Sequence, residues 1–473
     1  MSIYLAAVVL YVGVLLGVGF WRSRKVRTGD DFMVAGRTLP ARVLVFTLLS
    51  TWIGSGSLFG GAGLGYRVGF PALWQSAGAW IGIALVFFLA ARVRRIAQYT
   101  VPDILEIRYG ALARVLGTIA IVLAYTTIAA YQFRGGGRLL NLVTGIDPVT
   151  GALLTAIICI AFTAFAGMLS VAYLDVGNGL MMLLGVILAV VFLLGHGGGT
   201  EASLAALRPD QLSLFGALGP QAAIAVFLPT LFLLLGEANM YQKFFSARDG
   251  ATARRAVVGW IAGTILVESL IVGVGVFGSA ALPGLGTRES EAIVISVALD
   301  VLPTALGVLL LCGAAAIVMS TANSFLLTPS TNLMRDVYQR FINPAATDRQ
   351  ILRYTRVLVV VLGLTGFVIG NFFPTILSMA LWAYTMYGAG ITPALLAAFV
   401  WPRATRQGGV ASIATGILTT IGWEAAAAFR GSVLEPSYLL GIETVYPALL
   451  LSISALVVVS LVTPAPTKDA LAA

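Results

Sequence analysis

Residues 50–66, STWIGSGSLFGGAGLGY, place Gly and Ser in a stretch of the chain that is otherwise apolar. Gly is a poor helix former, and the Ser hydroxyl competes for backbone hydrogen bonds. A helix that unwinds here would leave carbonyl oxygens without partners, and such carbonyls can coordinate a cation. The alternative is a close contact between two helices, which small residues also allow.

A second polar interruption lies in residues 227–245, FLPTLFLLLGEANMYQKFF. Pro229 lacks a backbone donor, and Glu237 and Asn239 follow within the same apolar stretch. A carboxylate inside a membrane is costly, so Glu237 is a candidate for function. The alternative puts Glu237 at a helix end in the headgroup region, close to Lys243.

A third group of oxygen atoms is predicted in residues 313–325, GAAAIVMSTANSF. Ser320 and Thr321 are adjacent, and the carbonyl of Ile317 precedes Thr321 by one helical turn, so these oxygens lie close together. Neutral oxygens suit a hard monovalent cation. The alternative is that both hydroxyls bond to the backbone of their own helix.

The solvent of these segments is predicted to be lipid. The chain has 473 residues, 59% hydrophobic and 10% charged, with a mean hydropathy of +0.95. Soluble domains carry about 25% charged residues, so the chain is expected to be an integral membrane protein. The net charge of +9 comes from basic residues in short loops, which indicates membrane orientation and not a nucleic-acid partner.

The residues that commonly bind metals or act in catalysis are sparse. The two cysteines, Cys159 and Cys312, lie in apolar segments, and His196 is the only histidine. A disulfide framework, a His-based metal site and a catalytic triad are therefore not expected. No clustered nucleophile and base appear, so the chain is not expected to be an enzyme.

The apolar segments predict about thirteen membrane-spanning helices, because a bilayer core about 30 Å thick needs about 20 helical residues. They lie near residues 3–21, 43–66, 71–92, 115–134, 149–170, 172–195, 219–244, 255–282, 303–328, 352–371, 374–400, 408–429 and 441–463. Basic residues follow the first segment, which predicts a retained helix and not a signal peptide. Residues 100–110 and 331–341 are expected to form short amphipathic helices along the membrane surface.

The loops alternate in charge along the chain. Basic residues gather in the loops at residues 21–27, 91–95, 247–255, 335–356 and 403–406. The intervening loops, at residues 195–210, 283–292, 371–374 and 430–438, have few. This pattern predicts an N-terminus outside the cell and a C-terminus in the cytoplasm. Arg134 and Arg138, at the outer end of the fourth segment, are the exceptions.

The two interruptions fall in the second and seventh segments, so five segments separate them. Interrupted helices at matching positions of two halves indicate a transporter built from inverted repeats. We therefore expect an all-α fold with a 5+5 inverted-repeat core. Residues 42–195 form the first repeat and 219–400 the second, while 1–41 and 401–473 are peripheral.

The chain resembles the sodium:solute symporter family, which includes sodium/proline, sodium/galactose and sodium/sialic acid carriers. The resemblance covers nearly the whole sequence. Its motifs are DDFMVAGRTLP, STWIGSGSLFGGAGLGYRVG, ARVRRIAQYTVPDILEIRYG, YLDVGNGLMMLLG, GEANMYQKFFSARDGATARRA and AAAIVMSTANSFLLTPSTNLMRDVYQRF, in this order. The resemblance implies a leucine-transporter-type fold and Na⁺ as the co-transported ion.

The resemblance also implies a sodium site. Its ligands would be the carbonyls of Ser50, Ile53 and Ile317 and the hydroxyls of Ser320 and Thr321. Asp175 matches an acidic residue of the family that lies near the sodium route or a second sodium site. The alternative for Asp175 is a solvated position at the start of the sixth segment, so one and two sodium ions both remain open.

The solute pocket would draw on five helices of the implied core. Its candidates are Ser55, Ser57, Gln75, Ser76, Gln132, Arg134, Glu237, Asn239, Trp382 and Tyr384. An inward-facing Arg134 would favour a carboxylate, whereas Glu237 would favour hydroxyls or an amine. The alternatives are an Arg134 that reaches the headgroups, or a pairing of the two as a gate.

The expected function is sodium-coupled symport of a small polar organic solute, a carboxylate-bearing solute or a sugar, into the cell by alternating access. A proton-coupled carrier or exchanger on the same fold is the first alternative. A solute sensor that transports nothing is the second. The partners would be the solute, sodium and the lipid bilayer, with no nucleic acid. The protein would act as a monomer in a bacterial inner membrane.

Overall fold

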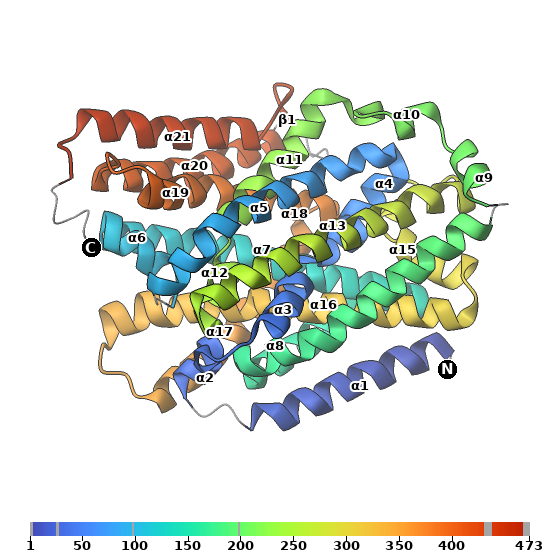
Figure 1. Ribbon diagram of the computed structural model, residues 1–473, viewed down its shortest axis with the longest axis horizontal. Coiled ribbons are helices and arrows are strands. Elements are labelled where there is room, and N and C mark those ends of the chain that lie inside the picture. Colours follow the sequence, from blue (N-terminus) through green and yellow to red (C-terminus); the bar gives the residue numbers. More distant parts are fainter. Residues whose placement is uncertain (1–2, 25–27, 97–98, 197–198, 430–437, 467–473) are drawn as a thin grey trace.

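The computed structural model describes residues 3–24, 28–96, 99–196, 199–429 and 438–466. Parts of two loops named above, at residues 25–27 and 430–437, therefore lie outside the described residues. The described chain is an elongated bundle of helices that run mainly along its longest axis (Figure 1). Its only described strands are β1 (Tyr438–Leu439) and β2 (Ile442–Glu443), which form a small hairpin.

The first half of the chain contains twelve α-helices and four short 3-10 or π-helical segments, which are marked η. They are α1 (Ile3–Ser23), α2 (Gly29–Val34), η1 (Ala35–Arg37), α3 (Ala41–Trp52), η2 (Gly56–Gly61), α4 (Ala62–Val68), η3 (Phe70–Ala72), α5 (Leu73–Ile96), α6 (Val101–Tyr109), α7 (Ala111–Thr144), α8 (Pro148–His196), α9 (Thr200–Ala205), α10 (Pro209–Leu212), η4 (Gly216–Leu218), α11 (Gly219–Gly236) and α12 (Ala238–Ser246).

The second half continues in the same way. It contains α13 (Gly250–Ala281), α14 (Thr287–Ser290), α15 (Ile293–Ser296), η5 (Val297–Val301), α16 (Thr304–Asn332), η6 (Leu333–Ile342), α17 (Asp348–Ile369), η7 (Gly370–Phe372), α18 (Ile376–Gly390), α19 (Thr392–Val400), α20 (Arg406–Phe429) and α21 (Val445–Val462).

The number of membrane crossings agrees with the sequence. Among the described residues, 11 helices are long and apolar enough to cross a membrane, and the bent pair α3 and η2–α4 makes up to 12. The 49 residues of α8 are enough for two crossings at 1.5 Å per residue. This element is two helices joined at Gly167 (φ 63°), where a β-carbon would lie 2.8 Å from the ring of Phe32. With α8 taken as two, the predicted set of about thirteen is complete.

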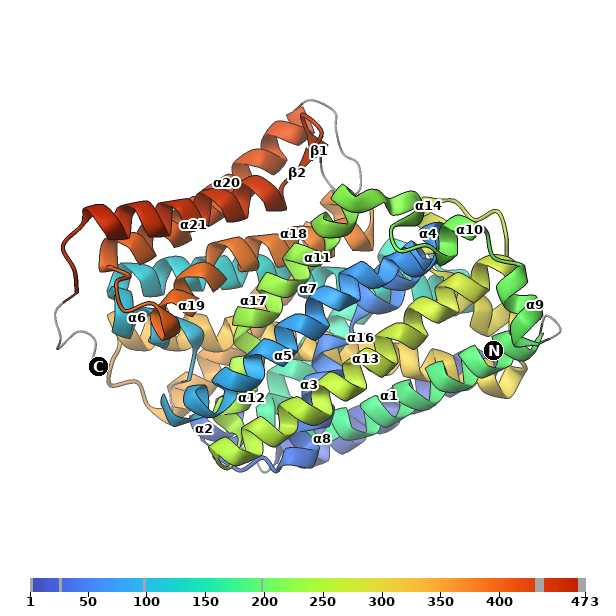
Figure 2. The same ribbon diagram turned by 45° about the horizontal axis from the view of Figure 1, so that its top comes forward.

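Peripheral helices lie on opposite sides of the bundle. α1 packs against α8, and α20 and α21 pack against each other on the far side, as the two views show (Figures 1 and 2). Of the helices between them, α16 and α18 are the most deeply buried. In α16, every residue from Leu310 to Asn332 is buried. A helix that is buried on all sides belongs to the core of the bundle.

Both predicted helix breaks are present. α3 ends at Trp52, and the chain resumes in Gly56–Val68 at an angle of 55°. α11 ends at Gly236, and α12 begins after Glu237, whose backbone is not helical (φ −59°, ψ 113°). The small residues beyond the first break also permit a close approach. A β-carbon at Gly63 would lie 2.8 Å from Cα of Glu291, so no side chain fits there.

One predicted surface helix is different in the structure. Residues 333–342 do not form a separate helix but continue α16 as wider π-helical turns. α6 is a separate short helix, and Thr100 caps it by accepting from the Asp103 N–H. An ion cluster joins the two elements, because Arg114 at the start of α7 contacts Asp103, Glu106 and Asp336.

Candidate functional site

The end of α3 and the middle of α16 meet inside the bundle. The Thr321 hydroxyl lies 3.1 Å from the carbonyl oxygen of Ser50 and 3.0 Å from that of Ile53. The Ser320 hydroxyl lies 3.1 Å from the same Ser50 carbonyl. All of these residues are buried. The break after α3 therefore places backbone carbonyl oxygens beside two hydroxyls of α16, a helix that is distant in sequence.

The two hydroxyls are thus not confined to their own helix. Ile317 lies one turn earlier in α16 and is also buried, and the role of its carbonyl as a sodium ligand stays a prediction. Four neutral oxygens, from Ser50, Ile53, Ser320 and Thr321, lie within hydrogen-bonding distance of one another, and oxygens of this kind are the ligands that a small hard cation prefers.

Asp175 lies beside these oxygens. Its carboxylate accepts from the Ser320 hydroxyl and from the Thr47 hydroxyl, both at 2.5 Å. Its carbonyl accepts from the Ser50 hydroxyl at 2.9 Å. Only 1% of Asp175 is exposed, so the alternative of a solvated position is wrong. The carboxylate adds a negative charge next to the four oxygens.

A positive charge lies close by, at a position that could not be predicted from the sequence. The ammonium of Lys243 on α12 donates to the Thr51 hydroxyl, to the Asn239 side-chain oxygen at 2.8 Å and to the Ser324 hydroxyl. Lys243 is fully buried, and its charge interacts with those of Asp175 and Glu237. The headgroup position considered for Glu237 and Lys243 is therefore wrong.

A small cavity lies at the first break. Four of the predicted solute residues line it: Ser57, Gln75, Ser76 and Tyr384. Trp52, Thr230 and Glu268 also line it and were not among the predicted pocket residues. The lining comes from α3, η2, α5, α11, α13 and α18, so both halves of the chain contribute.

Glu268 is the charged group of this cavity. One carboxylate oxygen accepts from the indole N–H of Trp52 at 2.9 Å, and the other accepts from that of Trp80 at 2.9 Å. The Ser57 hydroxyl lies 3.4 Å away. Two indoles and the serine hydroxyls of Ser57 and Ser76 therefore surround this carboxylate.

The remaining candidates lie at the two breaks and do not line the cavity. The side-chain oxygen of Gln132 accepts from the Ser55 N–H at 2.8 Å, at the first break. At the second break, Glu237 accepts from the Met240 N–H, and the Tyr125 hydroxyl lies 3.2 Å from its carboxylate. The Asn239 N–H donates to the same hydroxyl. These residues hold the unwound segments in place.

Arg134 and Trp382 lie away from the cavity. The Arg134 guanidinium donates to the carbonyls of Gly370, Phe373 and Pro374, between α17 and α18. Trp382 packs edge-on against the Phe373 ring and faces a different cavity, toward α20 and α21. A role for either residue in binding solute stays a prediction.

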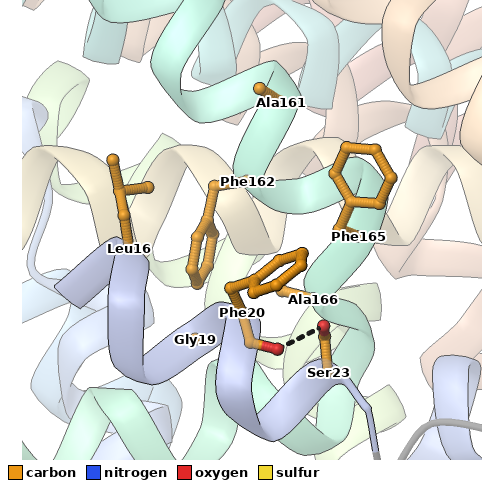
Figure 3. Close-up of a pocket in the computed structure, with 8 residues that line it drawn as sticks. All are labelled: Leu16, Gly19, Phe20, Ser23, Ala161, Phe162, Phe165 and Ala166. Atoms are coloured by element: carbon orange, nitrogen blue, oxygen red, sulfur yellow. Dashed lines mark hydrogen bonds between the residues drawn. The ribbon is translucent and has the colours of Figure 1, made fainter. Parts of the chain in front are cut away.

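A larger cavity, about 450 Å³, lies between α1 and α8 (Figure 3). Its wall is apolar and aromatic, with Leu16, Phe20, Phe162 and Phe165 around it. The Ser23 hydroxyl, which lines it, donates to the Phe20 carbonyl. A polar solute finds no recognition here, so the cavity near Glu268 is the better candidate for the solute.

Comparison with known sequences gives a consistent result. A family model described as the sodium:solute symporter family matches residues 32–416. The high-affinity proline transporter PutP of Bacillus subtilis is 26% identical over 86% of this chain and 89% of its own length. A sodium/proline symporter of Staphylococcus aureus is 28% identical, covering 97% of this chain and 92% of that protein.

Comparison with solved structures supports the same fold. A Na⁺-coupled sialic acid symporter, in a substrate-bound outward-open state, has a TM-score of 0.80 at 18% identity and covers 98% of this chain and 99% of its own. The nucleobase-cation-symport-1 transporter Mhp1, in a closed conformation, has a TM-score of 0.57 at 14% identity and covers 93% of this chain and 96% of its own. These likenesses confirm the predicted leucine-transporter-type fold.

Proposed function

The chain belongs to the sodium:solute symporter family, and from that premise we propose that it carries a small polar organic solute into the cell with sodium. Sodium is the co-transported ion of the family. The observation that carries the proposal is the meeting of the Ser50 and Ile53 carbonyls with the Ser320 and Thr321 hydroxyls. Together with the Ile317 carbonyl, these oxygens would form the sodium shell.

The mechanism is alternating access. Sodium holds α3 against α16 only while all of its ligands are assembled, so it favours one of two conformations. A ligand shifts such an equilibrium only by its differential affinity for the two states. The membrane potential adds about 2.3 kcal/mol per 100 mV for each charge that crosses. Solute then enters the cavity next to Trp52, at the same break.

Asp175 and Lys243 bear on the number of sodium ions. Asp175 contacts Ser320 directly, so it would either lie on the route by which sodium leaves or form part of a second sodium site. The ammonium of Lys243 already donates hydrogen bonds to Ser324 and Thr51, which neighbour the proposed sodium ligands in sequence. This built-in cation favours a stoichiometry of one sodium per cycle, because a second sodium would meet its charge.

The orientation follows from the loops. The face that carries the start of α1 also carries α9, α10 and α14, which have few basic residues (Figure 2). We place this face outside a bacterial inner membrane, with the C-terminus in the cytoplasm. A carboxylate-bearing solute was expected from Arg134, which donates to backbone carbonyls in this structure, and a solute with hydroxyls, such as a sugar, was expected from Glu237.

The test is uptake of a pooled solute library into proteoliposomes, with an inward gradient of sodium or of choline. Sodium-driven accumulation of one solute supports the proposal. Equal accumulation in choline would contradict sodium coupling, and dependence on a proton gradient would favour the proton-coupled alternative. Binding without accumulation would favour a sensor.

A further inference from the structure

The cavity between α1 and α8 faces the surrounding bilayer. Phe20 of α1 and Phe165 of α8 both line it, and these residues are 59% and 52% exposed (Figure 3). Ser23 is the one lining residue with a polar side chain, and its hydroxyl donates to the Phe20 carbonyl. An exposed apolar groove of this kind marks a site for an apolar ligand, and hydrocarbon is the ligand that this wall suits.

The groove runs from the depth of the hydrocarbon to that of the headgroups. Its lining extends along α1 from Leu16 to Ser23, which is about 10 Å of helix. α1 is apolar as far as Trp21 and becomes basic at Arg22. Trp is enriched where the bilayer meets water, and Trp21 is exposed. One end of the groove therefore lies where a lipid would place its phosphate.

Two guanidinium groups lie over the aromatic walls of the groove. The Arg24 guanidinium carbon lies 5.6 Å from the centroid of the Phe20 ring, and that of Arg356 on α17 lies 5.6 Å from the centroid of the Phe165 ring. Among the described residues, neither guanidinium forms an ion pair, and the buried Nε of Arg356 has no hydrogen-bond partner. Both positive charges are therefore available to an anion at this end of the groove.

The helices around the groove carry an excess of positive charge at the same end. Arg349, Arg353 and Arg356 lie on one face of α17, because they are spaced by four and three residues. α8 packs against both α1 and α17. Neither α1 nor residues 148–166 of α8 contain an acidic residue, and the one acidic residue of α17, Asp348, accepts from a backbone N–H of α2. The groove thus joins an apolar wall to a basic rim.

We propose that this groove binds a phospholipid with an anionic headgroup. An acyl chain lies between α1 and α8 against Phe20 and Phe165, and Arg24 and Arg356 hold the phosphate. Arginine pairs with phosphate through two parallel hydrogen bonds, and basic pockets between membrane helices select anionic headgroups. The inference goes beyond the transport function and does not depend on sodium coupling. Only the leaflet, that of the cytoplasmic face, follows from the orientation proposed above.

The test measures binding of single lipids to the purified, delipidated protein by native mass spectrometry. The probes are phosphatidylglycerol, phosphatidylcholine and diacylglycerol, all with palmitoyl and oleoyl chains, and glycerol 3-phosphate as a headgroup without chains. The first phosphatidylglycerol should bind at least about tenfold more tightly than any other probe. Equal binding of phosphatidylcholine or diacylglycerol would overturn the charged site, and equal binding of glycerol 3-phosphate would overturn the lipid.

Photocrosslinking locates the lipid on the unaltered protein. A phosphatidylglycerol with a diazirine in one acyl chain is bound at one equivalent, irradiated and mapped by peptide sequencing. Crosslinks are expected in residues 16–23 and 161–166. Crosslinks confined to other helices would overturn the inference, and this arm does not require that any variant folds.

A charge variant tests the rim. Arg24→Gln combined with Arg356→Gln should weaken phosphatidylglycerol by at least about tenfold, to the level of phosphatidylcholine. Arg254→Gln combined with Arg255→Gln is the matched control, because it removes the same charge and Arg254 also lies over a ring, 5.1 Å from the centroid of Phe87. The control should retain the full preference. An equal loss in both double variants would assign the preference to net charge and overturn the site.

A filling variant tests the wall. Ala161 lines the groove and is exposed, so Ala161→Trp fills it from the bilayer side without disturbing the core. The affinity for phosphatidylglycerol should fall at least about tenfold. Ala425→Trp, at an exposed position of α20 on the opposite side of the bundle, should leave it unchanged. An unchanged affinity in a folded Ala161→Trp protein would overturn the inference.

Discussion

The indole nitrogen of Trp52 lies 2.9 Å from a carboxylate oxygen of Glu268. Trp52 stands between Ser50 and Ile53 in sequence and lines the candidate solute cavity, so one wall of that cavity belongs to the break whose carbonyls would bind sodium. An ion that fixes this short segment also fixes one donor of the Glu268 carboxylate. Such a link is reciprocal, because each ligand must strengthen the other by the same factor.

Trp52→Phe should uncouple the two ligands. Phe keeps an aromatic ring but removes the N–H that reaches Glu268. In the unaltered protein, we expect sodium to tighten solute binding by at least about fivefold, and in Trp52→Phe this factor should fall toward one. The measurement is the dissociation constant, at low and high sodium, of the solute that the uptake screen identifies. Trp260→Phe is the control, because the buried Trp260 N–H has no hydrogen-bond partner among the described residues. Full coupling in Trp52→Phe would contradict the link.

Thr321→Ala should weaken sodium. The Thr321 hydroxyl reaches both the Ser50 and the Ile53 carbonyls, so its loss removes one ligand and the contact between two helices. We expect the sodium concentration for half-maximal uptake to rise at least about tenfold, which corresponds to about 1.4 kcal/mol.

The control for this variant is Thr355→Ala. The Thr355 hydroxyl is equally buried but bonds only to the Ile351 carbonyl of its own helix. It should leave the sodium dependence unchanged. A normal sodium dependence in Thr321→Ala would place the ion elsewhere.

Lys243→Gln should make sodium bind more tightly. Removing a nearby like charge lowers repulsion by about 1 kcal/mol, or about fivefold in affinity. Gln can still donate to Thr51 or Ser324, which limits the loss of stability. Sodium-dependent thermal shifts of the purified variant provide the measurement. Weaker sodium binding in a folded Lys243→Gln protein would show that the ammonium supports the site and does not compete with it.

Arg134→Lys should slow transport more than it weakens the solute. Three backbone carbonyls accept from this guanidinium, and a single ammonium cannot reproduce that arrangement. We expect the maximal rate of uptake to fall several-fold and KM to change by less than about threefold. A KM that rises by tenfold or more at a constant maximal rate would instead support the prediction that Arg134 binds a carboxylate of the solute.

The contact between Glu291 and α18 should depend on pH. The Glu291 carboxylate accepts from the N–H groups of Ile376 and Leu377 at the start of α18. Burial raises the pKa of Glu291, although these N–H groups and the nearby charges of Arg134 and Arg67 oppose the rise. A carboxyl with a raised pKa stabilises the contact below its ordinary pKa, and the stabilisation is lost as pH rises through the raised value.

Cysteine labelling can follow this contact. In a protein with Cys159 and Cys312 changed to Ser, the buried Ala292 is replaced by Cys and treated with a membrane-impermeant maleimide. Labelling should be slower at pH 5 than at pH 8, after correction for the reactivity of an exposed cysteine at each pH. Glu291→Gln should remove the difference. An unchanged pH dependence in that variant would assign it to another group.

The sequence could predict the parts of the site that depend on local composition. Gly and Ser in an apolar stretch predicted the break after Trp52, and adjacent hydroxyls in α16 predicted cation ligands. Asp175 and Lys243 stand out in the sequence as charged residues, but their burial could not be predicted. A helix buried on all sides has no polar face that would indicate where a charged side chain lies.

The Glu268 cluster could not be predicted for a different reason. Its partners come from α3 and α5, far away in sequence, and depend on how three helices pack. The turn at Gly167 was likewise predicted only as a gap between two segments. The continuation of α16 into η6 depends on the ion cluster at Asp336, which pairs with a residue of α7.

That ion cluster also determines which parts of the molecule can rearrange. Arg114 joins the start of α7 to the end of α16, and the same α16 carries Ser320 and Thr321. We therefore expect the two helices to move as one unit. Sodium bound to α16 would then change the position of the broken α3 relative to both of them.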